Sequence, residues 1–225
     1  MERFKQQQKA LQPIKIRDKI IDPSDFIFIA GPCTIENYDD LLLIVNRLKE
    51  MGIKFFRGGA YKMRTSPYDF GGLGEIGLKY LKKVSDKTGL ISVSEVISSE
   101  DVGIVSKYVD ILQVGTRNMH NYPLLKKLGK INNPIILKRG MSSTIEEWLF
   151  AAEYILEAGN QQVILCERGI RTFETFTRNT LDISAITSVK QLSNLPVIVD
   201  PSHSSGKREM IKSLSWAAAA AGADG

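Results

Sequence analysis

Residues 135–169 have the sequence IILKRGMSSTIEEWLFAAEYILEAGNQQVILCERG, and they contain the repeating unit from which the fold class can be predicted. It starts and ends with a short apolar run, of the kind found in strands that are buried on both faces. Between the runs, Thr144 and Glu147 have the spacing of a capping box, and Gly159 ends a helical pattern. The stretch therefore predicts two parallel strands joined by a helix.

The same alternation extends along the whole chain. Short apolar runs lie at residues 26–30, 54–57, 90–94, 110–114, 135–138, 163–167 and 197–200. Helical patterns lie at residues 39–51, 74–88, 144–158, 184–192 and 208–221. This alternation predicts an α/β fold, and so many units without a Pro- or Ser-rich linker favour a TIM (β/α)₈ barrel over an open sheet. The first run is not followed by Gly-x-Gly-x-x-Gly, so a dinucleotide-binding fold is disfavoured.

The two ends of the chain depart from this pattern. Residues 1–25 are expected to form an N-terminal extension, in which residues 13–21 alternate like a small hairpin covering the N-terminal end of the barrel. Residues 26–225 are expected to form the barrel itself, although a complete barrel typically takes ~250 residues. Residues 222–225 resemble the turn before a strand, so the eighth strand and helix are expected to be absent from this chain.

The composition is that of an ordinary soluble globular protein, with 43% hydrophobic and 24% charged residues. No apolar run approaches the ~20 residues of a membrane span, and the polar N-terminus does not resemble an export signal. Two cysteines are too few for a disulfide framework, so a cytoplasmic location is expected. The net charge is +5, but the longest basic run is two lysines. We therefore expect no membrane or nucleic-acid partner.

Cationic residues follow the ends of several predicted strands. They are Arg57, Lys62, Arg117, Lys138, Arg139 and Arg168. Active sites of such barrels lie at the C-terminal ends of the strands, so these side chains are expected to converge on one rim. Burying several like charges is costly unless an anion neutralises them. The pattern predicts a site for a phosphorylated, strongly anionic substrate pair; the alternative is that each cation is an ordinary solvated loop residue.

Cys33 follows the first predicted strand, and His203 follows the last. These strands lie one position apart in a closed barrel, so a thiolate and an imidazole can reach the same rim and form half of a Zn, Fe or Mn site. The alternatives are that Cys33 is a small buried hydrophobe and that His203 is an ordinary loop residue. Cys166 shares its pleat direction with Arg168 and is expected to pack inside the barrel.

An ordered set of motifs covers residues 26–225. The motifs are FIAGPC (28–33), RGGAYK (57–62), TSPY (65–68), QVGTR (113–117), KRG (138–140), ERG (167–169) and DPSHS (200–204). Together they resemble the 3-deoxy-D-arabino-heptulosonate 7-phosphate (DAHP) synthases, in the short form related to octulosonate 8-phosphate synthases. The resemblance implies a metal-dependent transferase that condenses phosphoenolpyruvate with erythrose 4-phosphate. This reaction is the first step of the shikimate pathway to chorismate and the aromatic amino acids.

The resemblance also implies roles for single residues. Lys62 is the expected general acid, and Cys33 and His203 are expected to be catalytic as two ligands of a divalent metal ion (Mn, Fe, Zn or Co). Arg64 and Thr65 are expected to hold erythrose 4-phosphate. The residues expected to bind phosphoenolpyruvate are Arg57, Lys62, Gly115, Thr116, Arg117, Lys138 and Arg168.

The chain departs from the family pattern in two places. Met63 stands where the family has a proline, which would stiffen the loop. The family's other two metal ligands, a Glu and an Asp, lie on and after the eighth strand, and Asp224 does not match either position. This chain is therefore expected to bind metal poorly and to turn over slowly or not at all.

Two other functions remain open at this stage. One is octulosonate 8-phosphate synthesis, which the sequence Arg-Thr-Ser-Pro at residues 64–67 disfavours, because that family usually has an Asn-Arg-Ser-Ser loop there. The other is a non-catalytic module that binds phosphorylated metabolites. The resemblance implies a homo-oligomer, either a dimer or a tetramer.

Overall fold

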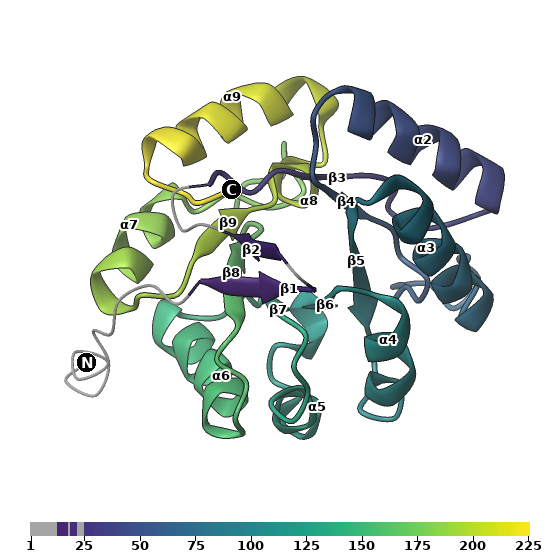
Figure 1. Ribbon diagram of the computed structural model, residues 1–225. Coiled ribbons are helices and arrows are strands. Elements are labelled where there is room, and N and C mark those ends of the chain that lie inside the picture. The colour runs from purple at the N-terminus through teal and green to yellow at the C-terminus, as the bar shows by residue number, and fades with distance from the viewer. Residues whose placement is uncertain (1–12, 18, 22–24) are drawn as a thin grey trace.

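A computed structural model describes residues 13–17, 19–21 and 25–225 (Figure 1). Its main sheet contains seven parallel strands, which pair in the order in which they occur in the chain. These strands are β3 (Ile29–Ala30), β4 (Phe55–Arg57), β5 (Ile91–Val96), β6 (Ile111–Val114), β7 (Ile135–Lys138), β8 (Val163–Glu167) and β9 (Val197–Val199). The predicted α/β architecture, a TIM barrel without one strand and helix, is confirmed.

Helices follow the strands and surround the sheet on its outside (Figure 1). They are α2 (Tyr38–Glu50), α3 (Glu75–Thr88), α4 (Val102–Tyr108), α5 (Tyr122–Leu128), α6 (Ile145–Glu157), α7 (Ile183–Leu192), α8 (Pro201–Ser205) and α9 (Arg208–Ala220), with a short 3-10 helix, η1 (Thr116–Asn118). The capping box of α6 forms as predicted: the Thr144 hydroxyl accepts from the Glu147 N–H, and the Glu147 carboxylate accepts from the Thr144 N–H.

Three helices lie outside the predicted helical segments. The helices α4 and α5 have seven residues each and α8 has five, which leaves too few turns for an apolar period to stand out. Two of them begin at polar caps instead, because the side chains of Asn121 and Asp200 accept backbone N–H groups at the starts of α5 and α8. Each of these two helices also has a proline in its first turn, where a missing N–H does no harm.

Alternate residues of the strands build two separate apolar cores. One lies inside the barrel and contains Ile27, Phe55, Ile91, Val93, Ile111, Ile136, Ile164, Cys166 and Ile198. The residues between them face outward and pack against the helices; the fully buried Trp148 of α6, for example, donates its Nε1–H to the Leu137 carbonyl at 3.1 Å. Cys166 therefore lies inside the barrel, as its pleat direction predicts.

The predicted hairpin is present and covers the N-terminal end of the barrel. Strands β1 (Ile14–Ile16) and β2 (Lys19–Ile21) pair antiparallel, and Figure 1 shows them lying across the strand ends. Ile14 and Ile16 are buried in the interior core. The Lys15 N–H donates to Gln162 Oε1 at 2.7 Å, directly before β8. The hairpin thus closes the end of the barrel opposite to the predicted site.

The sheet is open between its first and last strands. β3 and β9 stand at the two ends of the strand order. Near the hairpin, Asp224 O accepts from Ile27 N at 2.8 Å, and Gly225 O accepts from Val199 N at 3.0 Å. The pairing of β3 with β4 begins at Ile29, so β3 is shorter than the strand predicted at 26–30. Residues 224 and 225 thus bond to both sides of the gap, as the start of an inserted strand would.

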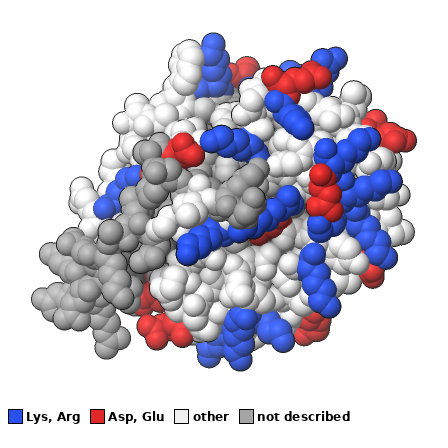
Figure 2. All heavy atoms as spheres, in the orientation of Figure 1, with Lys and Arg blue, Asp and Glu red and all other residues white. Residues whose placement is uncertain are grey.

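The hairpin face carries charges of both signs. Figure 2 shows Lys and Arg side chains scattered over several elements of this face, with Asp and Glu among them. None of the helices formed by the described residues is both long and apolar enough to cross a membrane. The net positive charge is therefore not confined to the predicted site, and the positions of individual cations carry more information than their sum.

The ion pair between Arg17 of the hairpin and Asp110, which we call the hairpin anchor, provides a test of the fold. Arg17 Nε and Nη2 lie 2.6 and 2.8 Å from the two carboxylate oxygens of Asp110, whose side chain is only 10% exposed. Replacing Arg17 by Ala removes the cation from a largely buried carboxylate, so we expect a loss of about 1–3 kcal/mol in the free energy of unfolding. Urea denaturation measures this loss.

The matched control is Arg47→Ala, because Arg47 and Glu50 form an ion pair whose side chains are 74% and 63% exposed. Such exposed pairs contribute about 0–1 kcal/mol. Equal losses in the two variants would contradict the role given to the hairpin anchor.

Candidate active site

A layer of polar side chains lies directly above the apolar interior of the barrel. Alternate residues of a strand face the same side, so the residue two positions beyond each interior residue also faces inward. On the strands from β4 to β9 these next residues are Arg57, Glu95, Gln113, Lys138, Arg168 and Asp200. They lie at the C-terminal ends of the strands, which is where barrel active sites form. We call this layer the rim.

Cys33 and His203 meet at the rim. The Cys33 sulfur lies 3.9 Å from His203 Nε2, although the two residues are far apart in the sequence. The other ring nitrogen, Nδ1, lies 2.6 Å from Asp200 Oδ2, and the His203 N–H donates to Asp200 Oδ1 at 3.0 Å. Lys138 Nζ lies 2.6 Å from the same Oδ2 atom. Asp200 thus fixes both the imidazole and the lysine.

The surroundings of the two cysteines shift their pKa values in opposite directions. The hydrogen bond from His203 lowers the pKa of the Cys33 thiol to about 5, against the opposing effect of burial, and the charges of Lys62 and Arg57 add to the lowering. Burial raises the pKa of the Cys166 thiol to about 12. At neutral pH, Cys33 is therefore a thiolate and Cys166 is a thiol.

The acid beneath the imidazole is ionised as well. Burial acts to raise the pKa of Asp200, but Lys138 and His203 outweigh it and hold that pKa well below its usual value. A buried carboxylate needs such partners because desolvation penalises its charge.

Two arginines flank the Cys33–His203 pair. Arg57 Nη2 donates to the Cys33 carbonyl at 3.4 Å, and Arg168 Nη2 donates to the His203 carbonyl at 3.1 Å. Arg168 is buried, and this burial lowers the pKa of its guanidinium. A guanidinium nevertheless stays charged in proteins. Arg168 is therefore a desolvated cation that an anion would stabilise.

The loop after β4 adds a second group of predicted residues. Arg64 Nη2 donates to the hydroxyl of Thr34, the neighbour of Cys33, at 3.0 Å. Arg117 Nη2 donates to the Thr65 hydroxyl at 2.8 Å. The structure thus places Arg64, Thr65 and Arg117 next to the Cys33 side of the rim.

Lys62 and Gly115 both lie against Glu95, an acid that is not among the predicted site residues. Lys62 Nζ lies 3.7 Å from Glu95 Oε2, and Gly115 packs against the same carboxylate. Thr116 follows Gly115 directly and begins η1. Glu95 and Asp200 could have been found from the period of two within each strand, which places them level with Arg57 and Lys138.

Arg139 does not belong to this set of cations. Its Nη1 lies 2.9 Å from Glu167 Oε2 and 2.8 Å from Asp182 Oδ2, and its side chain is buried. Although burial acts in the opposite direction, these two carboxylates raise the pKa of Arg139. The prediction that its charge faces the rim is wrong, because Arg139 is one position out of phase with Lys138 and points away from the interior.

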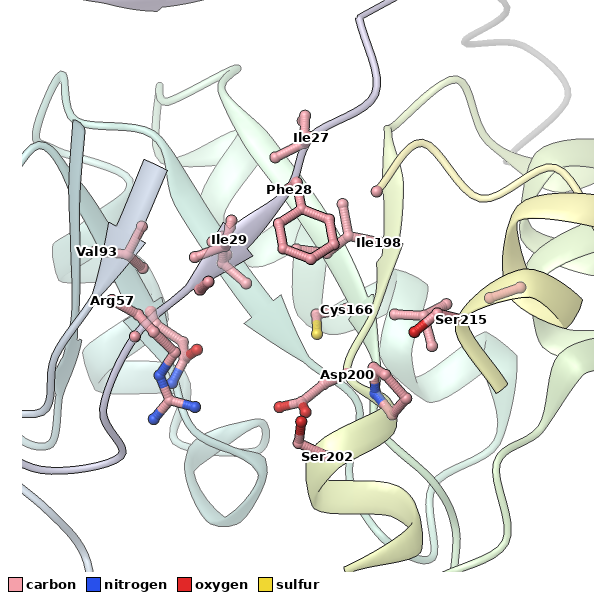
Figure 3. Close-up of a pocket in the computed structure, with 18 of the residues that line it drawn as sticks. Ile27, Phe28, Ile29, Arg57, Val93, Cys166, Ile198, Asp200, Ser202 and Ser215 are labelled. Carbon is pink, nitrogen blue, oxygen red and sulfur yellow. The ribbon is translucent and has the colours of Figure 1, made fainter. Parts of the chain in front are cut away.

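A cavity of about 310 Å³ opens beside the rim, between β3 and β9 (Figure 3). Arg57, Lys138 and Asp200 line it together with apolar side chains of the barrel interior. Figure 3 shows the Arg57 guanidinium and the Asp200 carboxylate extending from opposite sides toward the same end of the cavity. The cavity therefore joins the charged rim to the gap in the sheet.

Cys33 and His203 have side chains of the kinds that bind metal ions. A thiolate and an imidazole are suitable ligands for Zn, Fe or Mn, and a carboxylate on the second ring nitrogen is the usual support for a ligating histidine. Within residues 13–17, 19–21 and 25–225, however, no group of three or more His, Cys, Asp or Glu side chains is placed to hold a metal. Metal sites usually have about three or four protein ligands, so Cys33 and His203 form an incomplete set.

The fold and the rim together define an α/β-barrel protein whose site suits anionic ligands. The chain belongs to the DAHP synthetase I family, whose model matches residues 11–225. It is 49% identical, over 231 aligned positions, to a phospho-2-dehydro-3-deoxyheptonate aldolase of Thermotoga maritima. A 2-dehydro-3-deoxyphosphooctonate aldolase of Desulfatibacillum aliphaticivorans is 34% identical, with 88% of this chain and 78% of that protein covered.

Solved structures agree with this assignment. The phospho-2-dehydro-3-deoxyheptonate aldolase (DAHP synthase) of Thermotoga maritima superposes with a TM-score of 0.93 at 49% identity, covering 98% of this chain and 65% of that one. A truncated form of the Thermotoga maritima DAHP synthase superposes with a TM-score of 0.88, covering 96% of this chain and 79% of that one. The chain thus spans about two thirds of the length of these relatives: 68% of the curated Thermotoga maritima protein and 65% of the chain in the first solved structure.

The contrast between the two cysteines can be tested by alkylation. In the presence of a metal chelator, iodoacetamide should label Cys33 and leave the buried Cys166 unlabelled. Because the thiolate is the reactive form, the labelling rate should rise with pH through a midpoint of about 5 and then level off. Mass spectrometry of timed samples measures the rate.

The His203→Ala variant removes the hydrogen bond that lowers the Cys33 pKa. Its midpoint should move up toward the ordinary thiol value of about 8.5. An unchanged midpoint in this variant, or faster labelling of Cys166 than of Cys33, would contradict the described geometry.

Proposed function

We propose that this protein is a DAHP synthase, which condenses phosphoenolpyruvate with erythrose 4-phosphate and releases phosphate. The observation that carries the proposal is the gathering of Arg57, Lys138 and Arg168 around the Cys33–His203 pair at one barrel rim. Several cations in a partly buried site favour a ligand with several negative charges. The family assignment narrows that ligand to the substrates of the DAHP synthases.

Phosphoenolpyruvate is held by the rim cations in this proposal. Arg168 and Arg57 suit the bidentate recognition of phosphate and carboxylate groups, and Lys138 adds a point charge. Thr116 and the Gly115 backbone complete this side of the site together with Arg117. Arg64 and Thr65 bind the phosphate end of the aldose. Holding both reactants in one geometry supplies a large part of the rate acceleration.

Lys62 is the proposed general acid. C3 of phosphoenolpyruvate attacks the aldehyde carbon of erythrose 4-phosphate, so the carbonyl oxygen gains negative charge and needs a proton. In this proposal the Lys62 ammonium, which lies 3.7 Å from Glu95 at the rim, donates that proton. Water then adds at C2, and the phosphate leaves.

Cys33 and His203 are the proposed ligands of a divalent metal ion. Such an ion, when bound, supplies Lewis-acid polarisation of a carbonyl oxygen. Asp200 orients the imidazole toward Cys33, and the thiolate form of Cys33 is the form that binds metals. A metal bound there needs ligands beyond these two residues.

The tetrose phosphate is the proposed aldose. The chain is 49% identical to a heptonate aldolase and 34% identical to an octonate aldolase. The Arg-Thr-Ser-Pro sequence at 64–67 favours the same aldose.

We also propose that the protein is cytoplasmic and forms a homo-oligomer. Residues 1–25 are the proposed N-terminal extension, and residues 26–225 are the proposed barrel unit.

A turnover assay tests the proposal. Phosphate release from phosphoenolpyruvate, with a divalent metal present, should require erythrose 4-phosphate and should be much slower with arabinose 5-phosphate. The Lys62→Ala variant should lose turnover by about 10²–10⁴-fold, as expected for a lost general acid, while circular dichroism shows that it is still folded. Product identity is checked by mass spectrometry.

The matched control is Lys82→Ala, because Lys82 is an exposed residue of α3 that pairs with Asp86. This variant should keep wild-type turnover. Wild-type protein that makes product from neither aldose would reject the proposal in favour of a non-catalytic binding module. An active Lys62→Ala variant would reject the role of Lys62 alone.

A further inference from the structure

We propose that Glu95 is a positioning residue that holds the Lys62 ammonium in place for proton donation. This inference rests on the proposed function, because it concerns the residue that acts as general acid there. It assigns a role to an acidic side chain that lies inside a site built for anions.

The geometry places Glu95 opposite Lys62. Glu95 follows Val93 by two positions on β5, so it faces the inside of the barrel at the level of the rim. Its Oε2 atom lies 3.7 Å from Lys62 Nζ. The two side chains are only 11% and 14% exposed, so solvent screens this ion pair less than it screens a surface pair.

The absence of a side chain at Gly115 leaves room for the Glu95 carboxylate. A Cβ atom added to Gly115 would lie 2.1 Å from Glu95 Oε1 and 2.9 Å from its Cδ, so the Glu95 carboxylate would have to move from this position. The strand pairing explains the contact, because Glu95 is in register with Gln113 on β6, two positions before Gly115. The missing side chain at 115 thus lets the Glu95 carboxylate lie against the backbone, turned toward Lys62.

An acid at this position has an electrostatic cost. Glu95 lies in the same layer as Arg57 and Lys138, and its negative charge opposes the binding of phosphate and carboxylate groups there. The other inward-facing acid of the rim, Asp200, is occupied by Lys138 and His203. Glu95 has a comparable role, because it holds Lys62 as Asp200 holds Lys138.

The other cations of the site are also held by oxygen atoms. Arg117 donates to the Thr65 hydroxyl and to the Met63 carbonyl. Arg64 donates to the Thr34 hydroxyl and to the Phe70 carbonyl. Lys138 pairs with Asp200. A lysine has a long, flexible stem, so it needs such a partner to keep one direction. For Lys62, that partner is Glu95.

Kinetics of three variants test the inference. Glu95→Gln keeps the size of the side chain and removes its charge, so kcat should fall about 10–100-fold, as expected when a reacting group is misplaced by ~1 Å. The KM for phosphoenolpyruvate should stay the same or decrease, because a negative charge has left the anion site. Glu95→Asp keeps the charge but shortens the reach, and its kcat should lie between those of Glu95→Gln and the wild type.

The control is Glu50→Gln, which removes the same charge from an exposed position on α2. It should leave both kinetic constants unchanged. Circular dichroism of each variant confirms that it is folded.

The outcomes separate this inference from the proposed function. Wild-type protein without turnover would overturn the proposed function and this inference with it. Active wild-type protein combined with an unchanged kcat in Glu95→Gln would overturn the role of Glu95 alone. A raised KM with an unchanged kcat would also overturn it, because Glu95 would then support only substrate binding.

Discussion

One oxygen atom, Asp200 Oδ2, lies 2.6 Å from both Lys138 Nζ and His203 Nδ1. This contact joins the end of β7 to the end of β9 and to α8, so it sets the positions of a rim cation and of the imidazole at once. The imidazole in turn faces Cys33 and makes its thiol acidic. Without the carboxylate, Lys138 would be a buried charge with no compensating acid here, and the Cys33–His203 pair would lose its orientation.

The electrostatics of the rim favour an anionic ligand. Asp200 and Glu95 each hold a lysine, whereas Arg57 and Arg168 contact backbone carbonyls. A carbonyl oxygen satisfies a donor without cancelling its charge, so the two guanidinium groups remain available to phosphate and carboxylate groups. The same rim adjoins the cavity beside β3 and β9.

Much of this arrangement could be predicted from the sequence. The apolar runs predicted all seven strands of the main sheet, because parallel strands are buried on both faces. The alternation of these runs with helical patterns predicted the barrel. The short helices α4, α5 and α8 were beyond prediction, since the Asn121 and Asp200 caps of two of them resemble ordinary loop residues. Glu95 and Arg139 could have been assigned from the period of two, which puts Glu95 on the inward face and Arg139 one position out of phase with Lys138. The ion partners of Arg139 could not, because Glu167 and Asp182 lie on other segments of the chain and meet Arg139 only in the fold.

The proposed function requires that the rim at the C-terminal ends of the strands binds the anionic groups of phosphoenolpyruvate. A crystal structure of the protein grown with phosphoenolpyruvate shows whether it does. The phosphate and carboxylate oxygens should lie within hydrogen-bond distance of Arg57, Lys138 and Arg168. Phosphoenolpyruvate bound on the hairpin face, with these three side chains making no contact to it, would rule out the proposed site.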